Sequence, residues 1–94
     1  MDKSFIKKLY AKAERQKYAL GAFNFSTMEI FHSIINVAER MKSPVMVTTS
    51  EGEENLFQAK EAVVVVNALK HKLKNQMILH ADHHKTFETC KKLY

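Results

Sequence analysis

The stretch Pro44-Val45-Met46-Val47-Thr48-Thr49-Ser50 decides the fold class. Residues 45–50 of this stretch are mostly apolar or β-branched and show no polar alternation, which predicts a strand buried on both faces. Pro44 cannot continue a preceding helix, and it directs Ser43 toward extended geometry. Both faces of such a strand must be covered by other elements, so the flanking sequence decides the architecture.

Amphipathic helical patterns lie on both sides of this strand. Residues 4–17, residues 26–41 and the region between Glu51 and Leu73 carry apolar side chains at helical spacing. Ser26 and Glu29 match a capping box at the start of the second helix, and Thr86 is expected to cap a short last helix. The run Val63 to Val66 has low helix propensity, but the helical pattern continues on both sides of it, so we expect helix there.

Two further short apolar segments, residues 18–24 and 77–81, are predicted to be buried strands. Strands that alternate with amphipathic helices indicate a parallel sheet with right-handed crossovers. A closed barrel of this kind needs eight strand–helix units and about 250 residues. We therefore expect an α/β chain that is the N-terminal part of a TIM (β/α)8 barrel, with a leading helix and about three βα units. Residues 1–94 would form a single partial domain, and the simplest account is a fragment.

Composition narrows the function classes. The chain has 94 residues, with 15 Lys and Arg against 10 Asp and Glu, a formal charge of +5, and one cysteine. No apolar run approaches the length of a membrane span, and the charged start does not fit a signal peptide. A single cysteine cannot form an internal disulfide. We therefore expect a cytoplasmic protein that has neither a membrane span nor a disulfide. The cations lie on the polar sides of helices, which favours a solvated surface over nucleic-acid binding.

Polar residues follow each predicted strand at Asn24, Ser50 and Asp82. Side chains alternate along a strand, so Asn24 shares a face with Ala22, Ser50 with Thr48, and Asp82 with His80. Active sites of parallel barrels lie at the carboxyl ends of the strands. The alternative is that Asn24 and Ser50 are ordinary loop or cap residues.

The segment His80-Ala81-Asp82-His83-His84 contains three imidazoles and one carboxylate. Neutral imidazole binds zinc and other transition metals, and a neighbouring carboxylate can act as general acid or base. Ligands this close in sequence cannot easily surround one ion, so one of them is expected to bind metal together with residues from elsewhere. An exposed histidine-rich turn is the alternative.

Three motifs together resemble the class II, zinc-dependent fructose-bisphosphate aldolase family, which includes tagatose-bisphosphate aldolases. They are Gly21-Ala22-Phe23-Asn24, the segment from Lys42-Ser43-Pro44-Val45 to Ser50-Glu51-Gly52, and Leu79-His80-Ala81-Asp82-His83. Their order and spacing cover nearly the whole chain, and the His-x-Asp-His element is the most specific part.

The resemblance implies a TIM-barrel lyase of carbohydrate metabolism and glycolysis that reversibly cleaves a ketose bisphosphate to dihydroxyacetone phosphate and an aldehyde. Zn²⁺ acts as a Lewis acid in this family. His83 matches the first zinc ligand and Asp82 the catalytic acid and base. Asn24 and Ser50 match substrate contacts near the aldehyde-side phosphate. The remaining zinc ligands and phosphate loops of the family match nothing in these 94 residues, so the chain alone is expected to be inactive, and a homo-oligomer is implied for a full-length protein.

Two residues depart from the family pattern. His84 stands where a small residue such as glycine is usual, so the loop differs or His84 competes for metal. Thr48 stands where many members have glutamine, which removes one expected substrate contact.

Two other functions stay open from the residues alone. One is a different metal-dependent TIM-barrel lyase or isomerase that uses the same edge of the sheet. The other is a non-enzymatic basic module that binds nucleic acid or a protein through its helices. For the isolated chain, the apolar sheet face predicted to be uncovered favours self-association.

Overall fold

The computed structural model describes residues 4–50, 52, 59–74 and 76–91. Its elements follow in the order α1 (Ser4–Gln16), β1 (Ala22–Asn24), α2 (Met28–Met41), β2 (Val45–Ser50), α3 (Ala59–Leu69), η2 (Lys70–Leu73), β3 (Met77–Asp82) and α4 (Phe87–Lys91). The three strands form one parallel sheet in the order β1-β2-β3. This open α/β arrangement, with strands and helices alternating, confirms the predicted fold class.

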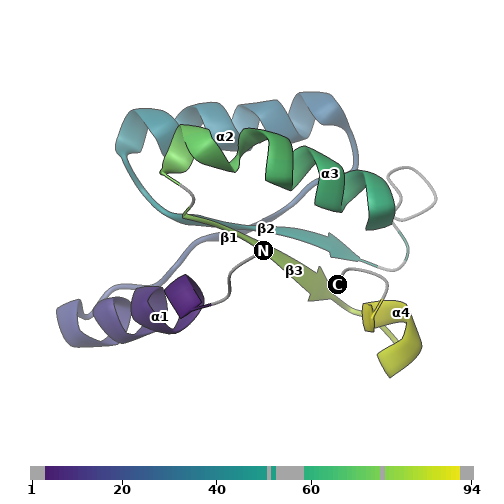
Figure 1. Cartoon of the computed structure of the whole chain (residues 1–94), viewed down its shortest axis with the longest axis horizontal. Helices are drawn as coiled ribbons and strands as arrows, with labels where there is room; N and C mark the ends of the chain where they lie inside the picture. The colour runs from purple at the N-terminus through teal and green to yellow at the C-terminus, as the bar shows by residue number, and fades with distance from the viewer. Residues whose placement is uncertain (1–3, 51, 53–58, 75, 92–94) are drawn as a thin grey trace.

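One face of the sheet packs against α2 and α3, which lie side by side above it (Figure 1). The buried apolar strand residues on this face are Val45, Val47 and Met77, and the partly buried Leu79 packs against them. These strand residues pack against apolar residues of α2, α3 and η2 and against Phe25, which follows β1. These partners complete the main core: Phe25, Phe31, Ile35, Ala38, Ala62, Val66 and Leu73. The predicted helix through Val63–Val66 is confirmed, and it tightens into a 3-10 turn at Lys70–Leu73.

The opposite face of the sheet is covered at its amino-terminal end by α1 (Figure 1). Leu9 of α1 packs against Met46 of β2 and Ile78 of β3, and Phe5, Ile6 and Leu20 border this second cluster. The prediction that one face of the sheet is uncovered was wrong for the amino-terminal part of this face, which the apolar stripe of α1 buries. The polar residues lie beyond this cover, toward the carboxyl ends of the strands.

β1 differs from the buried strand predicted for residues 18–24. It has only three residues, and all three are exposed, because β1 is the edge strand of the described sheet. The chain before it completes the end of α1: Lys17 adopts a left-handed conformation, and the Tyr18 N–H donates to the carbonyl of Ala13 at 3.0 Å. Hydrogen bonding to β2 therefore begins only at Gly21, whose carbonyl accepts from the Met46 N–H at 2.9 Å.

The predicted capping box at Ser26 was also wrong. Thr27 is the N-cap of α2, with extended backbone, and its hydroxyl accepts a hydrogen bond from the Ile30 N–H at 3.2 Å. Glu29 still lies in the first turn, where a negative charge favours the helix dipole. At the other end of the chain, the predicted cap Thr86 is confirmed by its hydroxyl, which accepts from the Thr89 N–H at 3.2 Å.

Some sequence predictions lie outside the described residues. These are the acidic residues 51, 53 and 54 before the third helix, and the apolar residues 93 and 94 of the last helix. In the part of the chain that the structure describes, no helix has the length and apolarity to span a bilayer.

Candidate active site

The carboxyl ends of the three parallel strands lie side by side at one end of the sheet, which we call its carboxyl edge. Ser50, the last residue of β2, is directly opposite Asp82, the last residue of β3. Asn24, the last residue of β1, is opposite Thr48, two residues before Ser50. Side chains two residues apart on a strand share a face, so Asn24, Ser50 and Asp82 project from the same face at the same edge. The structure thus brings these predicted site residues together.

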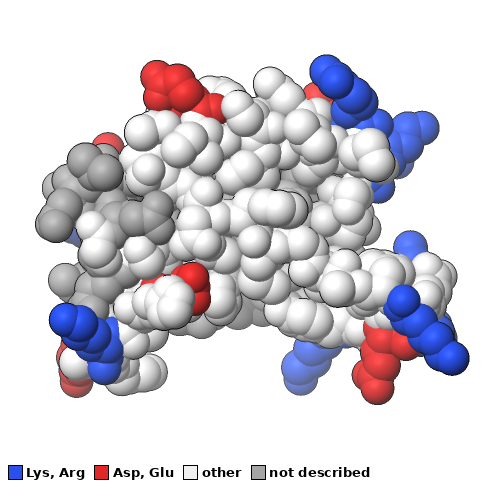
Figure 2. Space-filling view, turned by 180° about the vertical axis from the view of Figure 1, so that it is seen from behind, with Lys and Arg blue, Asp and Glu red and all other residues white. Residues whose placement is uncertain are grey.

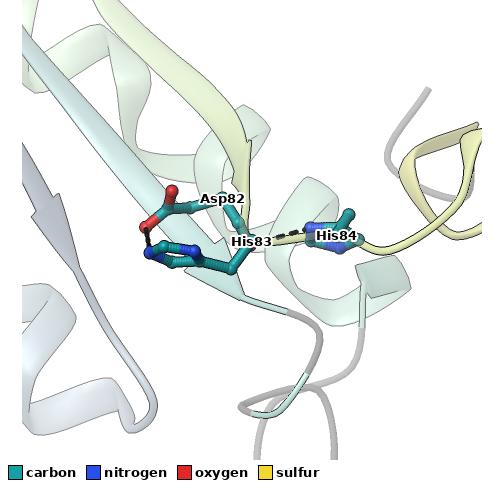
Figure 3. A network of polar contacts seen from close by, with 3 residues as sticks. All are labelled: Asp82, His83 and His84. Atoms are coloured by element: carbon teal, nitrogen blue, oxygen red, sulfur yellow. Dashed lines mark hydrogen bonds and ion pairs between the residues drawn. The ribbon is translucent and has the colours of Figure 1, made fainter.

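The side chains of Asp82 and His83 lie side by side at this edge. Nε2 of His83 lies 3.6 Å from Oδ2 of Asp82 (Figure 3). The imidazole is 84% exposed and the carboxylate 33% exposed, so the acid is held at the end of the strand while the ring stays accessible. His83 has a left-handed backbone with φ of 53°. Non-glycine residues adopt this conformation at an energetic cost, and such residues are frequent at functional sites.

His84 does not join the Asp82–His83 pair. Its ring points to the opposite side of the chain (Figure 3), where Nδ1 lies 3.0 Å from the backbone carbonyl oxygen of Asp82. This contact ties His84 to the backbone of the turn and keeps its ring away from the His83 ring. Both possibilities that the sequence leaves open for His84, a loop that differs from the family pattern and competition for metal, stay predictions.

A second set of polar side chains lies two residues before Ser50 and Asp82 along their strands. Thr48 is directly opposite both Asn24 and His80 in the strand register. Thr48 is only 2% exposed, and its hydroxyl has no hydrogen-bond partner among the described residues. A buried hydroxyl without a partner costs about 1–3 kcal/mol. The sequence analysis noted Thr48 only as a departure from a family pattern. The sequence does not show that its hydroxyl is buried without a hydrogen-bond partner.

The residues at this edge fit one part of a zinc site. The exposed His83 imidazole has the donor type that zinc prefers, and the Asp82 carboxylate lies beside it. Catalytic zinc normally takes three protein ligands. Among the residues that the structure describes, no cluster of three or more His, Cys, Asp or Glu side chains could hold a metal.

Comparison with known proteins identifies the family. The model of the family described as "Fructose-bisphosphate aldolase class-II" matches residues 5–94. The chain is similar to a probable fructose-bisphosphate aldolase of Bacillus subtilis, with 36% identity over 83 residues, 85% of this chain and 29% of that protein. It is also similar to the fructose-bisphosphate aldolases of Helicobacter pylori (34% identity, 86% of this chain, 27% of the relative) and Geobacillus stearothermophilus (35%, 92% and 31%).

The chain spans less than a third of the length of these relatives. The family fold is a TIM barrel, and the three parallel strands with their helices agree with its N-terminal portion. The match covers both the polar strand ends and the Asp82–His83 pair. The chain therefore belongs to the class II fructose-bisphosphate aldolase family, a family of lyases.

Proposed function

We propose that this chain supplies the N-terminal part of the active site of a zinc-dependent ketose-bisphosphate aldolase. The reaction is the reversible aldol cleavage of a fructose-bisphosphate or tagatose-bisphosphate type of substrate to dihydroxyacetone phosphate and an aldehyde. The observation that carries this proposal is the strand register, with Ser50 opposite Asp82 and Asn24 on the same face of the same edge.

Asp82 is the proposed catalytic acid and base. Its carboxylate is partly exposed at the end of a paired strand, so it can reach a bound substrate and is held by the sheet. It would take the proton from the aldehyde-side hydroxyl during cleavage and return it in the reverse direction. A positioned acid or base of this kind contributes about 10²–10⁴-fold to a reaction rate.

His83 is the proposed zinc ligand, and its exposed ring suits that role. Bound zinc would supply Lewis-acid polarisation of the substrate ketone. Asn24 and Ser50 are proposed to donate hydrogen bonds to the aldehyde-side phosphate. Both have neutral polar side chains, which can donate to phosphate oxygens without a buried counter-charge.

Residues 1–94 are proposed to act as a single partial domain. We propose that the remaining zinc ligands come from outside this sequence, as the family resemblance implies, so that zinc binding and turnover require them. The proposed partners are a phosphorylated ketose and dihydroxyacetone phosphate, and neither nucleic acid nor a membrane. We place the complete protein in cytoplasmic carbohydrate metabolism, as a homo-oligomer.

The test is a cleavage assay on the complete product of the gene. Released dihydroxyacetone phosphate is measured with fructose 1,6-bisphosphate and tagatose 1,6-bisphosphate in separate reactions. We expect activity that disappears on chelation and returns with Zn²⁺, and a His83→Ala variant that loses bound zinc. Cleavage that persists without any metal, or zinc retained in full by His83→Ala, would contradict the proposal.

A further inference from the structure

Thr48 carries a buried hydroxyl group on the face of the sheet that bears the candidate site. It lies two residues before Ser50 in β2, so the two side chains share a face. Thr48 is 2% exposed, and its hydroxyl has no hydrogen-bond partner among the described residues. Buried hydroxyl groups in native proteins are in the large majority paired. A partner is therefore expected close to Thr48.

The partner must come from the side chains that already surround Thr48. The hydroxyl oxygen has almost no accessible surface, so neither bulk water nor residues from outside this sequence can reach it without displacing its neighbours. In the strand register Thr48 is directly opposite Asn24 of β1 and His80 of β3. Neighbouring strands lie about 4.8 Å apart, which brings both side chains within reach of the hydroxyl.

His80 is the better partner of the two. The polar side chain that β1 offers is Asn24, and Asn24 is already engaged in another contact. Figure 2 views the molecule from behind, where β1 and α2 lie nearer the viewer, and shows a broad central surface without charged side chains, so no ionic partner comes from that side. The His80 side chain, by contrast, is in no hydrogen bond or ion pair with the described residues. Its ring has both a donor and an acceptor nitrogen.

We propose that the Thr48 hydroxyl donates a hydrogen bond to Nδ1 of His80, and that His80 held in this way is a further substrate-binding residue. Rotation of the ring about its side-chain bonds brings Nδ1 to the usual hydrogen-bond distance of about 2.8 Å. In a neutral imidazole whose Nδ1 accepts, the proton is on Nε2. Thr48 therefore fixes the tautomer and the orientation of the ring. It is a positioning residue that does not itself touch the substrate.

The position of His80 decides what its Nε2–H can bind. His80 lies two residues before Asp82 in β3 and on the same face. Backbone positions two residues apart on a strand are separated by about 6.6 Å, a span that a bound sugar phosphate covers. Nε2–H of His80 donates to a hydroxyl oxygen on the aldehyde side of the ketose bisphosphate, next to the hydroxyl group that Asp82 deprotonates. This inference rests on the proposed aldolase function and adds a donor to it.

The test measures kcat, KM and zinc content of the complete gene product with the bisphosphate that it cleaves. His80→Ala should raise KM by about tenfold and change kcat by less than about twofold, because it removes a hydrogen bond that holds the ground state and the transition state alike. Zinc content should stay the same. Thr48→Val keeps the shape without the hydroxyl and should raise KM by about threefold, while Thr48→Ser, which keeps the hydroxyl, should restore it.

Thr49→Val is the matched control for Thr48→Val. Thr49 is the next residue of β2, and its hydroxyl is also buried without a partner among the described residues. Its side chain faces the helices instead of the site, so the same substitution should leave KM unchanged. A crystal structure of the complete gene product adds a readout that does not depend on activity. We expect Oγ1 of Thr48 within about 3.2 Å of Nδ1 of His80.

Three results would overturn this inference: an unchanged KM in His80→Ala or Thr48→Val, another hydrogen-bond partner of Thr48 in the crystal structure, or zinc lost in His80→Ala. None of them touches the proposed function, which is tested by turnover in Asp82→Ala and by zinc content in His83→Ala. If the complete gene product cleaves neither bisphosphate, the proposed function fails and the substrate role of His80 fails with it. The crystal structure then still decides whether Thr48 and His80 are bonded.

Discussion

Asp82 stands where a paired strand ends and a left-handed turn begins. The strand fixes its backbone opposite Ser50, and the turn at His83 brings the imidazole within 3.6 Å of its carboxylate. The sequence motif predicts that a carboxylate and a histidine lie together. It contains no signal for the positive φ of His83 or for the contact of His84 with the Asp82 carbonyl, because both arise from how the turn leaves the sheet.

A residue-scale prediction concerns Thr49. This residue is fully buried against the helices, and its hydroxyl has no hydrogen-bond partner among the described residues. Valine has nearly the same shape without the hydroxyl. Thr49→Val should therefore raise the free energy of unfolding by about 1 kcal/mol, because a buried unpaired polar group is removed. Urea denaturation measures this change.

The matched comparison for Thr49 is Thr86, whose hydroxyl accepts a hydrogen bond from the Thr89 N–H at the start of α4. Thr86→Val removes a made hydrogen bond and should give no gain in stability. If Thr49→Val instead lowers the free energy of unfolding, as the loss of a buried hydrogen bond does, then the Thr49 hydroxyl has a hydrogen-bond partner and the account of this position is wrong.

At the scale of the elements, α2 shows what decides a helix start. Its N-cap is Thr27, because that residue has extended backbone and an exposed side chain that can reach the Ile30 N–H. Ser26 satisfies the sequence pattern equally well but lies one residue too early. We expect Thr27→Ala to lower the free energy of unfolding by about 1 kcal/mol, and Ser26→Ala to lower it by less.

Thermal unfolding of the two single variants, followed by circular dichroism, decides between these caps. A larger loss for Ser26→Ala than for Thr27→Ala would restore the predicted capping box and contradict the observed one. The two residues are adjacent, and each variant removes a side-chain hydroxyl group, together with one exposed methyl group in Thr27→Ala.

Element types could be predicted well where pattern and burial agree. β2 was predicted with the bounds that the structure has, since its residues are buried almost throughout. β1 was predicted too long, because residues 18–20 are apolar enough for a strand, but Tyr18 is still bonded to the end of α1 and residues 19 and 20 belong to no helix or strand. The position of α1 on the second face of the sheet could not be predicted. The spacing of its apolar residues shows which side of the helix is buried, but not which surface of the sheet it packs against.

At the scale of the whole molecule, the hydrophobic clusters and the candidate site occupy different parts of the sheet. The helix-facing core and α1 hold the strands together at their amino-terminal and central parts. The polar side chains gather at the carboxyl ends, away from both clusters. This separation follows from parallel pairing, which sends every strand end to one edge, and it is why the candidate site could be predicted once the three strands were recognised.

The central claim is that this edge forms part of a working aldolase site in which Asp82 moves a proton. The direct measurement compares kcat and zinc content of the complete gene product with those of its Asp82→Ala variant. Glu88→Ala, which removes an exposed carboxylate from nearby α4, is the matched control. The account predicts that Asp82→Ala lowers kcat by about 10²–10⁴-fold with zinc content unchanged, while Glu88→Ala changes neither. Unchanged turnover in Asp82→Ala would contradict it.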